Sequence, residues 1–353
     1  MNKKAVVQIK TPYGLTEPVD VTDIVKQGGI LGSPMCSATT AEYCEHNKGI
    51  NVGNVSIASL AFVDDIADLS TTFQDAVESH HNALSFAKRK KLQLAPDKCY
   101  IMLLQPKNKP KVIPQLEIDG GLVKEVDSIV YLGDVFNNKG NNDDLVTTMV
   151  SIQSFMRDTS LGTHTLGVYI LLHNAIFLPG MLFNSQAWSK LTDKNITTLT
   201  TIQLRYLKKA MKVRQAAANA FTFLELGVLP IKYEIHRRQL SFLYHIVSLK
   251  EDDPVKKIWR YQKSLPEHGN WWSDVKRLLE RYAIKFDENE IADMSKETYK
   301  KKVKEAVFDQ ALKDLTNENH GKTRTKNITF NKLETQDYLK QMNPSDARTI
   351  FKC

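Results

Sequence analysis

The chain has 353 residues, of which 42% are hydrophobic and 25% are charged. These proportions exclude a fibrous or intrinsically disordered protein, and the length allows one large hydrophobic core or two ordinary ones. The 48 Lys and Arg residues outweigh the 40 Asp and Glu residues and leave a formal charge of +8, which favours polyanionic partners through counterion release.

The first predicted elements are two strands that meet at an acidic turn. Residues 55–63 are rich in β-branched and small apolar side chains, and they lead directly into Asp64-Asp65 and a second apolar run. A helix is predicted next, because Thr72 and Asp75 resemble a capping box and apolar residues then recur at helical spacing.

Further short strands are predicted after this helix. Residues 99–104 form an apolar run suited to a buried strand, 116–119 precede a Gly-Gly turn, and 128–133 form another apolar run. After the turn-rich segment 137–142 the pattern becomes helical, and the polar, basic stretch 317–326 indicates a linker before a last short helix.

These elements predict an α+β protein with three regions. We expect an α+β lobe at 1–136, an all-helical lobe at 137–316, and a basic linker with a C-terminal helix at 317–353.

We predict no membrane segment and an intracellular protein, nuclear or cytoplasmic. The first residues contain no apolar run of signal-peptide length. The most apolar stretch, 166–183, is interrupted by His173, Asn174 and Pro179-Gly180, which favours a buried helix. The four cysteines lie far apart, so neither a disulfide framework nor a zinc site is predicted.

Asp64 and Asp65 are the strongest candidates for chemistry. Two adjacent carboxylates at a hairpin tip repel each other unless a cation lies between them. Mg²⁺ or Mn²⁺ suits such hard oxygen ligands, and a pair of these ions can activate a 3′-hydroxyl and stabilise the leaving pyrophosphate. An exposed acidic turn without a ligand is the alternative interpretation.

Phe62-Val63-Asp64-Asp65 resembles the aromatic-x-Asp-Asp box of reverse transcriptases, and neighbouring segments match that family in the same order. The chain is therefore similar to the reverse transcriptases of non-LTR retrotransposons. The resemblance implies part of a right-hand polymerase palm followed by a helical thumb and connector. It also implies RNA-directed DNA synthesis from deoxynucleoside triphosphates on a DNA primer and an RNA template, with metal ions held at Asp64 and Asp65 and the nucleotide beside Phe62.

Two further boxes add to the resemblance. Gln27 and Gly28 lie in a segment similar to the family's Gln-Gly loop beneath the incoming nucleotide and template base. The family commonly places proline directly after the next Leu-Gly, whereas here Ser33 precedes Pro34. Lys98 matches a family lysine near the nucleotide phosphates, where it could protonate pyrophosphate, although a lysine after a turn is also an ordinary solvated charge.

Tyr131-Leu132-Gly133 resembles the family's primer-grip hairpin, in which glycine permits close backbone contact with the primer. An ordinary aromatic strand end is the alternative. The segments 182–188 and 224–231 are similar to segments that follow the polymerase core in non-LTR elements.

A basic stripe is predicted in the helical lobe. Arg205, Lys208, Lys209 and Lys212 lie at spacings that place them on one helix face. They are candidates for contacts with nucleic-acid phosphates, and a solvated face is the alternative. The Trp pair at 271–272 suits either base stacking or packing.

The family's other metal aspartate would lie in a strand well before Gln27, but only 26 residues precede Gln27 and none match. The resemblance therefore predicts a truncated palm that is inactive as a polymerase alone, because most of the transition-state stabilisation would be lost. The far end also suggests truncation, because Cys353 closes the chain where the family often continues into a cysteine/histidine cluster. A non-catalytic nucleic-acid-binding remnant and a structural or dimerisation module are the alternatives.

Overall fold

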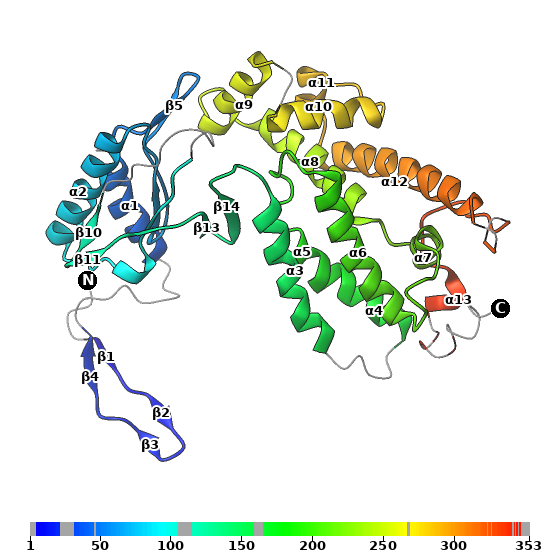
Figure 1. Ribbon diagram of the computed structural model, residues 1–353, viewed down its shortest axis with the longest axis horizontal. Helices are drawn as coiled ribbons and strands as arrows, with labels where there is room; N and C mark the ends of the chain where they lie inside the picture. Colours follow the sequence, from blue (N-terminus) through cyan, green and yellow to red (C-terminus); the bar gives the residue numbers. More distant parts are fainter. Residues whose placement is uncertain are drawn as a thin grey trace. The chain divides into compact units, whose positions relative to one another are not determined.

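The structure of the protein is a computed structural model, which describes residues 5–21, 32–45, 47–104, 115–158, 165–266, 269–322, 324–325, 327–340, 342, 344 and 346. The chain divides into two compact units, which we call the α/β unit and the helical unit (Figure 1). The α/β unit comprises Met1–Asn51, Ser56–Cys99 and Val112–Val123, and the helical unit comprises Val52–Val55, Tyr100–Lys111 and Lys124–Cys353.

The fold mixes α and β elements, as predicted. The described strands are β1 (Ala5–Val7), β2 (Lys10–Thr11), β3 (Gly14–Leu15), β4 (Val19–Val21), β5 (Ile50–Val52), β6 (Val55–Ile57), β7 (Ser59–Phe62), β8 (Asp65–Asp68), β9 (Tyr100–Ile101), β10 (Glu117–Ile118), β11 (Gly121–Leu122), β12 (Lys124–Glu125), β13 (Ser128–Tyr131) and β14 (Asp134–Asn137). The described helices are α1 (Gly32–Cys44), α2 (Phe73–Lys90), the 3-10 helix η1 (Pro96–Lys98), α3 (Asp143–Asp158), α4 (Leu166–Leu172), the π-helix η2 (His173–Phe177), α5 (Leu178–Met181), α6 (Asp193–Ala210), α7 (Asn219–Leu226), α8 (Ile231–Ser248), α9 (Pro254–Ser264), α10 (Trp271–Arg281), α11 (Glu288–Asp293), α12 (Lys296–His320) and α13 (Asp337–Lys340).

The strands form small sheets. Among the described residues they pair two by two, as β1–β4, β2–β3, β5–β6, β7–β8, β9–β12, β10–β11 and β13–β14. The β9–β12 pair is parallel, whereas β7–β8 and β13–β14 are antiparallel hairpins. The palm arrangement implied by the resemblance therefore stays a prediction. The predicted lobe boundary at residue 136 does not coincide with the division into units, because 124–136 belongs to the helical unit.

The hairpin and the helix predicted around the acidic turn are both present. Thr72 caps α2, since its Oγ1 accepts a hydrogen bond from the Asp75 backbone N–H at 3.1 Å. The helix ends at Lys91 in the left-handed region, with φ 55°. The strand predicted at 99–104 is shorter than expected, because β12 pairs only with Tyr100–Ile101.

Helix α8 lies at the centre of the helical unit. Its side chains Ile231, Ile235, Leu240, Leu243 and Val247 recur at helical spacing and are buried. The helix packs against α6, α9, α10, α11 and α12, so it is the shared surface on which these helices bury their apolar faces. Figure 1 shows α8 between the green and orange helices.

The polar segment predicted at 317–326 belongs to the helical unit, and the short helix predicted after it is α13. Helix α12 continues through Asn319, whose Nδ2 donates to the Thr325 carbonyl oxygen at 2.8 Å. Further on, Thr335 Oγ1 donates to the Leu226 carbonyl oxygen at 2.8 Å. A side chain at Gly227 would meet the backbone of residues 334–335 at 2.0 Å. The described residues from 327 to 340, which we call the tail, therefore pack directly on the end of α7. The basic composition of the segment gave no sign of this packing, because the packing depends on backbone contacts.

The apolar stretch 166–183 forms the successive helices α4, η2 and α5 and then a turn. Within it, His173 is fully buried, and its Nε2 lies 3.2 Å from Gln203 Nε2 on α6. The segment is therefore helical, as predicted, but it is buried on one face only, since Leu171 and Ile176 are exposed. No described helix is both long and apolar enough to cross a bilayer.

The docked tail yields a test of stability. Leu339 on α13 is 0% exposed, whereas Leu171 on α4 is 64% exposed. We expect Leu339→Ala to lower the free energy of unfolding by about 2–4 kcal/mol, because it leaves a cavity, and Leu171→Ala to change it by less than about 0.5 kcal/mol. Urea denaturation of both variants measures this, and equal small effects would show that the tail is not docked.

A second test concerns His236 on α8. Its Nδ1 lies 2.6 Å from the Tyr282 hydroxyl oxygen, within hydrogen-bonding distance. Burial, assisted by Lys232 and Arg281, lowers the pKa of His236 from 6.5 to about 3. The pKa of His236 is lower in the folded chain than in the unfolded chain, so the neutral ring contributes stability at pH values above the unfolded pKa. This contribution is lost as the pH falls towards the folded pKa.

Between pH ~6.5 and ~5 the unfolded chain binds more protons at this residue, with a limiting slope of about 1.4 kcal/mol per pH unit. His236→Asn keeps an acceptor for Tyr282 and should flatten the dependence of the unfolding free energy on pH. Urea denaturation across this range is the measurement. His173, whose pKa burial also lowers, contributes equally to both proteins, so identical slopes in wild type and variant would contradict the prediction.

Candidate functional site: the Asp64-Asp65 hairpin

The acidic pair lies at the tip of the β7–β8 hairpin. Phe62 pairs with Asp65 and Ser59 with Asp68 across the two strands, so only Val63 and Asp64 remain to make the turn. Both aspartates are exposed, and the Phe62 side chain beside them is 60% exposed. The hairpin therefore presents two carboxylates and an aromatic ring together at one place.

The backbone at the tip is strained. Val63 has φ 57°, in the left-handed region that a β-branched residue rarely adopts. Such a conformation is unfavourable by about 1–3 kcal/mol and persists only where the surroundings impose it, often at functional sites. Here the two-residue turn between paired Phe62 and Asp65 imposes it.

The base of the hairpin is held by a polar cluster around Asp68. Its Oδ2 accepts from the Tyr43 hydroxyl at 2.5 Å, and its Oδ1 accepts from Ser59 Oγ at 2.5 Å and Asn47 Nδ2 at 3.3 Å. Burial and the Asp68 carboxylate raise the pKa of Tyr43. The sequence interpretation missed this cluster, although the Ser59–Asp68 pair follows from the register of a two-residue turn.

Helices α1 and α2 support the hairpin. Helix α1 packs against β7 and also contacts α2. The rings of Tyr43 and Phe86 lie 5.3 Å apart, which joins the two helices, and Glu42 forms ion pairs with Arg89 and Lys90. The basic run at the end of α2 is therefore partly engaged within the α/β unit.

Asp64 and Asp65 have the right chemistry for a divalent ion but do not form a complete metal centre alone. Mg²⁺ prefers six oxygen ligands in near-octahedral geometry. The described residues contain no group of three or more His, Cys, Asp and Glu side chains that could hold a metal ion. An ion here would need further ligands from a bound nucleotide or from water.

The other predicted residues of the nucleotide site are not brought together with the pair by any contact in the described part of the chain. Gln27 and Gly28 lie outside the described residues. Lys98 is exposed at the end of η1, in the same unit as the hairpin. Its backbone N–H donates to the Ala95 carbonyl oxygen at 2.9 Å, which closes the 3-10 turn.

The predicted primer-grip residues form a hairpin turn in the helical unit. Tyr131 pairs with Asp134, and Leu132 and Gly133 make the turn with φ of 51° and 84°. A side chain at Gly133 would lie 3.1 Å from the Phe183 ring. Asn184 Nδ2 also donates to Asp134 Oδ2 at 2.9 Å. Close packing on this glycine thus comes from the 182–188 segment of the same chain.

The predicted basic stripe on α6 is only partly exposed. Arg205 and Lys209 are exposed on the helix, whereas Lys212, also exposed, lies in the turn beyond the helix end at Ala210, with φ 52°. Lys208 is 3% exposed, and burial lowers its pKa. Its Nζ donates to the carbonyl oxygens of residues 215 and 217 and to Oδ1 of Asn219, at 2.6–2.7 Å.

Lys208 is therefore withdrawn from the set of phosphate contacts. Arg205, Lys208 and Lys209 lie on α6 as predicted, but Lys208 is on its buried side, where the segment after α6 and the first residue of α7 present three acceptors. An ammonium group has only three N–H donors, so protein acceptors already use the donors of Lys208.

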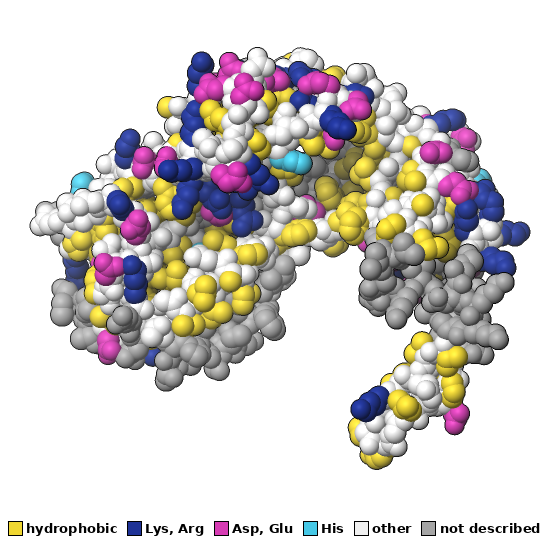
Figure 2. Space-filling view, turned by 180° about the vertical axis from the view of Figure 1, so that it is seen from behind, with side chains coloured by type: hydrophobic (Ala, Val, Ile, Leu, Met, Phe, Trp, Pro, Cys, Tyr) yellow, Lys and Arg dark blue, Asp and Glu magenta, His cyan; other side chains and the backbone are white. Residues whose placement is uncertain are grey.

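Helix α12 carries basic residues that the sequence interpretation did not single out. Lys300, Lys301 and Lys304 are exposed, and Lys302 pairs with Glu290 at 3.5 Å. Figure 2 shows a dense group of Lys and Arg side chains on the helical unit, with acidic side chains among them. The sequence feature that could have identified these basic residues is the run at 300–304, Lys-Lys-Lys-Val-Lys.

The Trp pair has two different environments. Trp271 is buried, and its Nε1 donates to the Gln186 carbonyl oxygen at 2.8 Å, which is the packing role weighed in the sequence analysis. Trp272 is half-buried, and its ring lies 4.9 Å from that of Phe286.

No protein-family model matches this chain, and no curated protein matches its sequence. The functional interpretation of the hairpin therefore depends on its own residues and geometry.

The strain at Val63 yields a third test. We expect Val63→Gly to stabilise the hairpin by about 0.5–1 kcal/mol, because glycine adopts positive φ without steric strain. Ala67→Gly, in the same hairpin but without a positive φ, should destabilise it by a similar amount. Hydrogen exchange of the β7–β8 amides measures both changes, and a destabilising effect of Val63→Gly would contradict the strain.

Proposed function

We propose that this chain is a reverse-transcriptase domain fragment of a non-LTR retrotransposon, in which Asp64 and Asp65 hold Mg²⁺ or Mn²⁺ against an incoming deoxynucleotide. The observation that carries the proposal is the β7–β8 hairpin. It presents two carboxylates at a strained two-residue turn, directly after an apolar strand and beside an exposed aromatic ring.

The charge of the hairpin supports this assignment. Two exposed carboxylates in adjacent positions repel each other and attract a divalent cation, and a nucleotide triphosphate supplies the additional oxygen ligands that the described residues lack. Phe62 offers a ring face to a base or sugar at the same tip. The hairpin thus suits a metal–nucleotide complex better than a bare ion.

Nucleic acid is the second ligand of this proposal. The exposed Arg205 and Lys209 of α6, and Lys212 in the turn that follows it, would contact the phosphates of an RNA template and a DNA primer, and the net charge of +8 adds a favourable long-range field. Binding that depends on such contacts weakens steeply with salt.

Asp64 provides the fourth test. In isothermal titration calorimetry with Mn²⁺ and a deoxynucleoside triphosphate, in the presence of primer–template, we expect Asp64→Asn to weaken metal–nucleotide binding at least about tenfold. Loss of a charged ligand in direct contact is typically equivalent to more than about 1.4 kcal/mol. Asp119→Asn is the matched control, because Asp119 is an exposed acid at the β10–β11 turn of the same unit.

Equal binding by wild type and both variants, or no heat with any of them, would overturn the metal site. Primer extension on an RNA template then measures whether the chain incorporates deoxynucleotides. We expect no incorporation, since the described residues bring no third ligand to the pair. Incorporation that Asp64→Asn abolishes would show that the metal centre is complete.

A second candidate function is non-catalytic binding of nucleic acid. The exposed lysines of α12, together with the α6 residues, favour it because they need no metal. This function predicts binding that persists in EDTA and falls with salt, and that Asp64→Asn leaves unchanged. Metal-dependent nucleotide binding distinguishes the first candidate from the second.

A further inference from the structure

The helical unit contains a solvent-open hollow with an aromatic wall. It has a volume of about 390 Å³ and lies between α10 and the segment that follows it. Trp272 and Phe286 supply aromatic rings, and Leu279 and Ile284 supply aliphatic surface. A hollow of this size and composition falls within the range of small-ligand sites.

The two rings are held by a third ring and a cation. Trp272 and Phe286 have ring centroids 4.9 Å apart, and Trp259 stands nearly perpendicular to both, at 5.7 and 6.4 Å. The Lys263 ammonium lies 4.7 Å from the Trp259 centroid, 5.2 Å from that of Phe286 and 5.6 Å from that of Trp272. Cation–π attraction to all three rings fixes their orientation.

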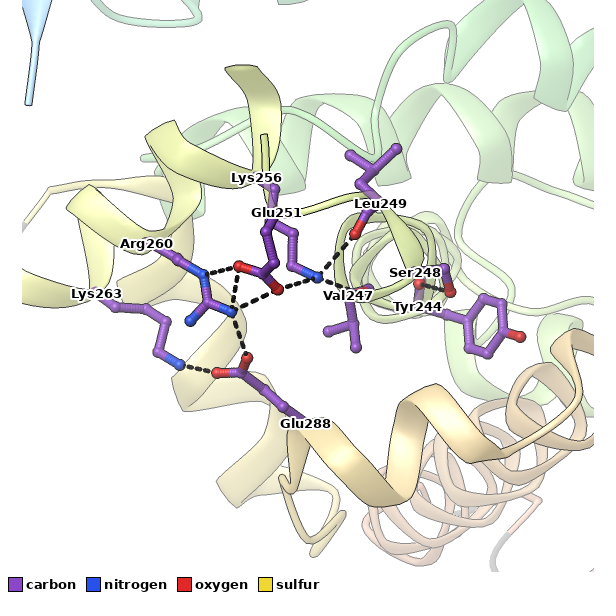
Figure 3. A network of polar contacts seen from close by, with 9 residues as sticks. All are labelled: Tyr244, Val247, Ser248, Leu249, Glu251, Lys256, Arg260, Lys263 and Glu288. Atoms are coloured by element: carbon purple, nitrogen blue, oxygen red, sulfur yellow. Dashed lines mark hydrogen bonds and ion pairs between the residues drawn. The ribbon is translucent and has the colours of Figure 1, made fainter. Parts of the chain in front are cut away.

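Lys263 is itself anchored by a charged network (Figure 3). It pairs with Glu288, which also meets Arg260 at 3.5 Å. Arg260 continues to Glu251 at 2.8 Å, and Glu251 pairs with Lys256 at 2.9 Å. The chain of ion pairs runs along α9 and reaches α11, so it links the two helices on either side of the Lys263 ammonium.

The network ends on the backbone of α8. Lys256 Nζ donates to the carbonyl oxygens of Val247 and Leu249, at 2.9 and 2.8 Å. It therefore satisfies orphan acceptors at the C-terminus of the central helix. Figure 3 shows these contacts and the side chains that converge from α9 and α11.

The rim of the hollow is basic. Lys276 and Lys285 line it, and Glu280 is the acidic residue among the lining side chains. An aromatic wall with two lysines at its edge matches a ligand with a flat, apolar face and a nearby anion. A nucleotide within a single strand has this combination, because every base has a face that stacks and every sugar carries a phosphate.

We propose that this hollow binds one unpaired base of a single-stranded nucleic acid, stacked on Trp272 and contacting Phe286, whose ring is inclined at 59° to that of Trp272, with the flanking phosphates beside Lys276 and Lys285. The inference gives the helical unit a binding site for an unpaired strand. It rests on the nucleic-acid-binding part of the proposed function but needs neither Asp64 nor a metal ion.

The test uses the full chain and fluorescein-labelled oligodeoxythymidylate of 12 nucleotides, in EDTA. A 12-unit oligomer of the same backbone without bases is the second probe, because it retains phosphates but cannot stack. We expect wild type to bind the thymidylate at least about fivefold more tightly than the abasic oligomer, as stacking of one base provides. Tryptophan emission should fall on binding of the thymidylate only.

Substitutions assign the effect to the hollow. Trp272→Leu should remove the preference for bases, and Trp272→Phe should retain it while reducing the change in emission. Lys285→Glu should weaken binding of both probes about fivefold or more, since it reverses a charge at the rim. Lys250→Glu makes the same charge change at an exposed residue outside the lining and should have a smaller effect.

Equal affinity for the two probes, or a preference that survives Trp272→Leu, would overturn the site. Should Trp272→Leu fail to fold by circular dichroism, Trp272→Phe and Lys285→Glu decide the question, because both keep the ring contacts. An absence of thymidylate binding also overturns it. Failure of the metal–nucleotide site is a separate result, since it concerns Asp64 and is measured with Mn²⁺.

Discussion

The pairing of Phe62 with Asp65 is the constraint on which the candidate site depends. It leaves two residues for the turn, places Val63 at positive φ and brings both aspartates to the tip. The same register places Ser59 opposite Asp68, where the Tyr43 hydroxyl closes the polar cluster. A shift by one residue would move every side chain of the hairpin to the other face. The same strand register therefore sets both the acidic tip and the polar cluster around Asp68.

The lysines show why net charge is a poor guide to the residues that contact a polyanion. Lys208 donates to three acceptors in a loop, and Lys256 donates to the end of α8. Lys263 lies among three aromatic rings. Each is a structural cation, stabilised because its ammonium has found acceptors or ring faces inside the fold. Exposed cations such as Arg205 on α6 and Lys300 on α12 differ from these three in pointing to solvent.

Segments that are distant in sequence are joined in the helical unit by close backbone packing. Gly227 allows the 334–335 backbone to cross the end of α7, and Gly133 allows the Phe183 ring to cover the β13–β14 turn. Both glycines have positive φ, so they serve the local turn and the distant contact together. The segments 182–188 and 224–231, noted for their family resemblance, are thus the surfaces on which the hairpin turn and the tail pack.

The local elements could be predicted from the amino-acid sequence. Apolar spacing, the Thr72 cap and the acid pair were enough to predict the hairpin and α2, and a switch to helical periodicity predicted the helical region, because these signals act between residues close in the chain. The burial of Lys208, the packing of residues 334–339 on the helical unit, and the clustering of Trp272, Phe286 and Lys263 emerge from the three-dimensional fold. Those outcomes depend on which acceptors and ring faces distant segments supply, and spacing along one helix contains no information about them.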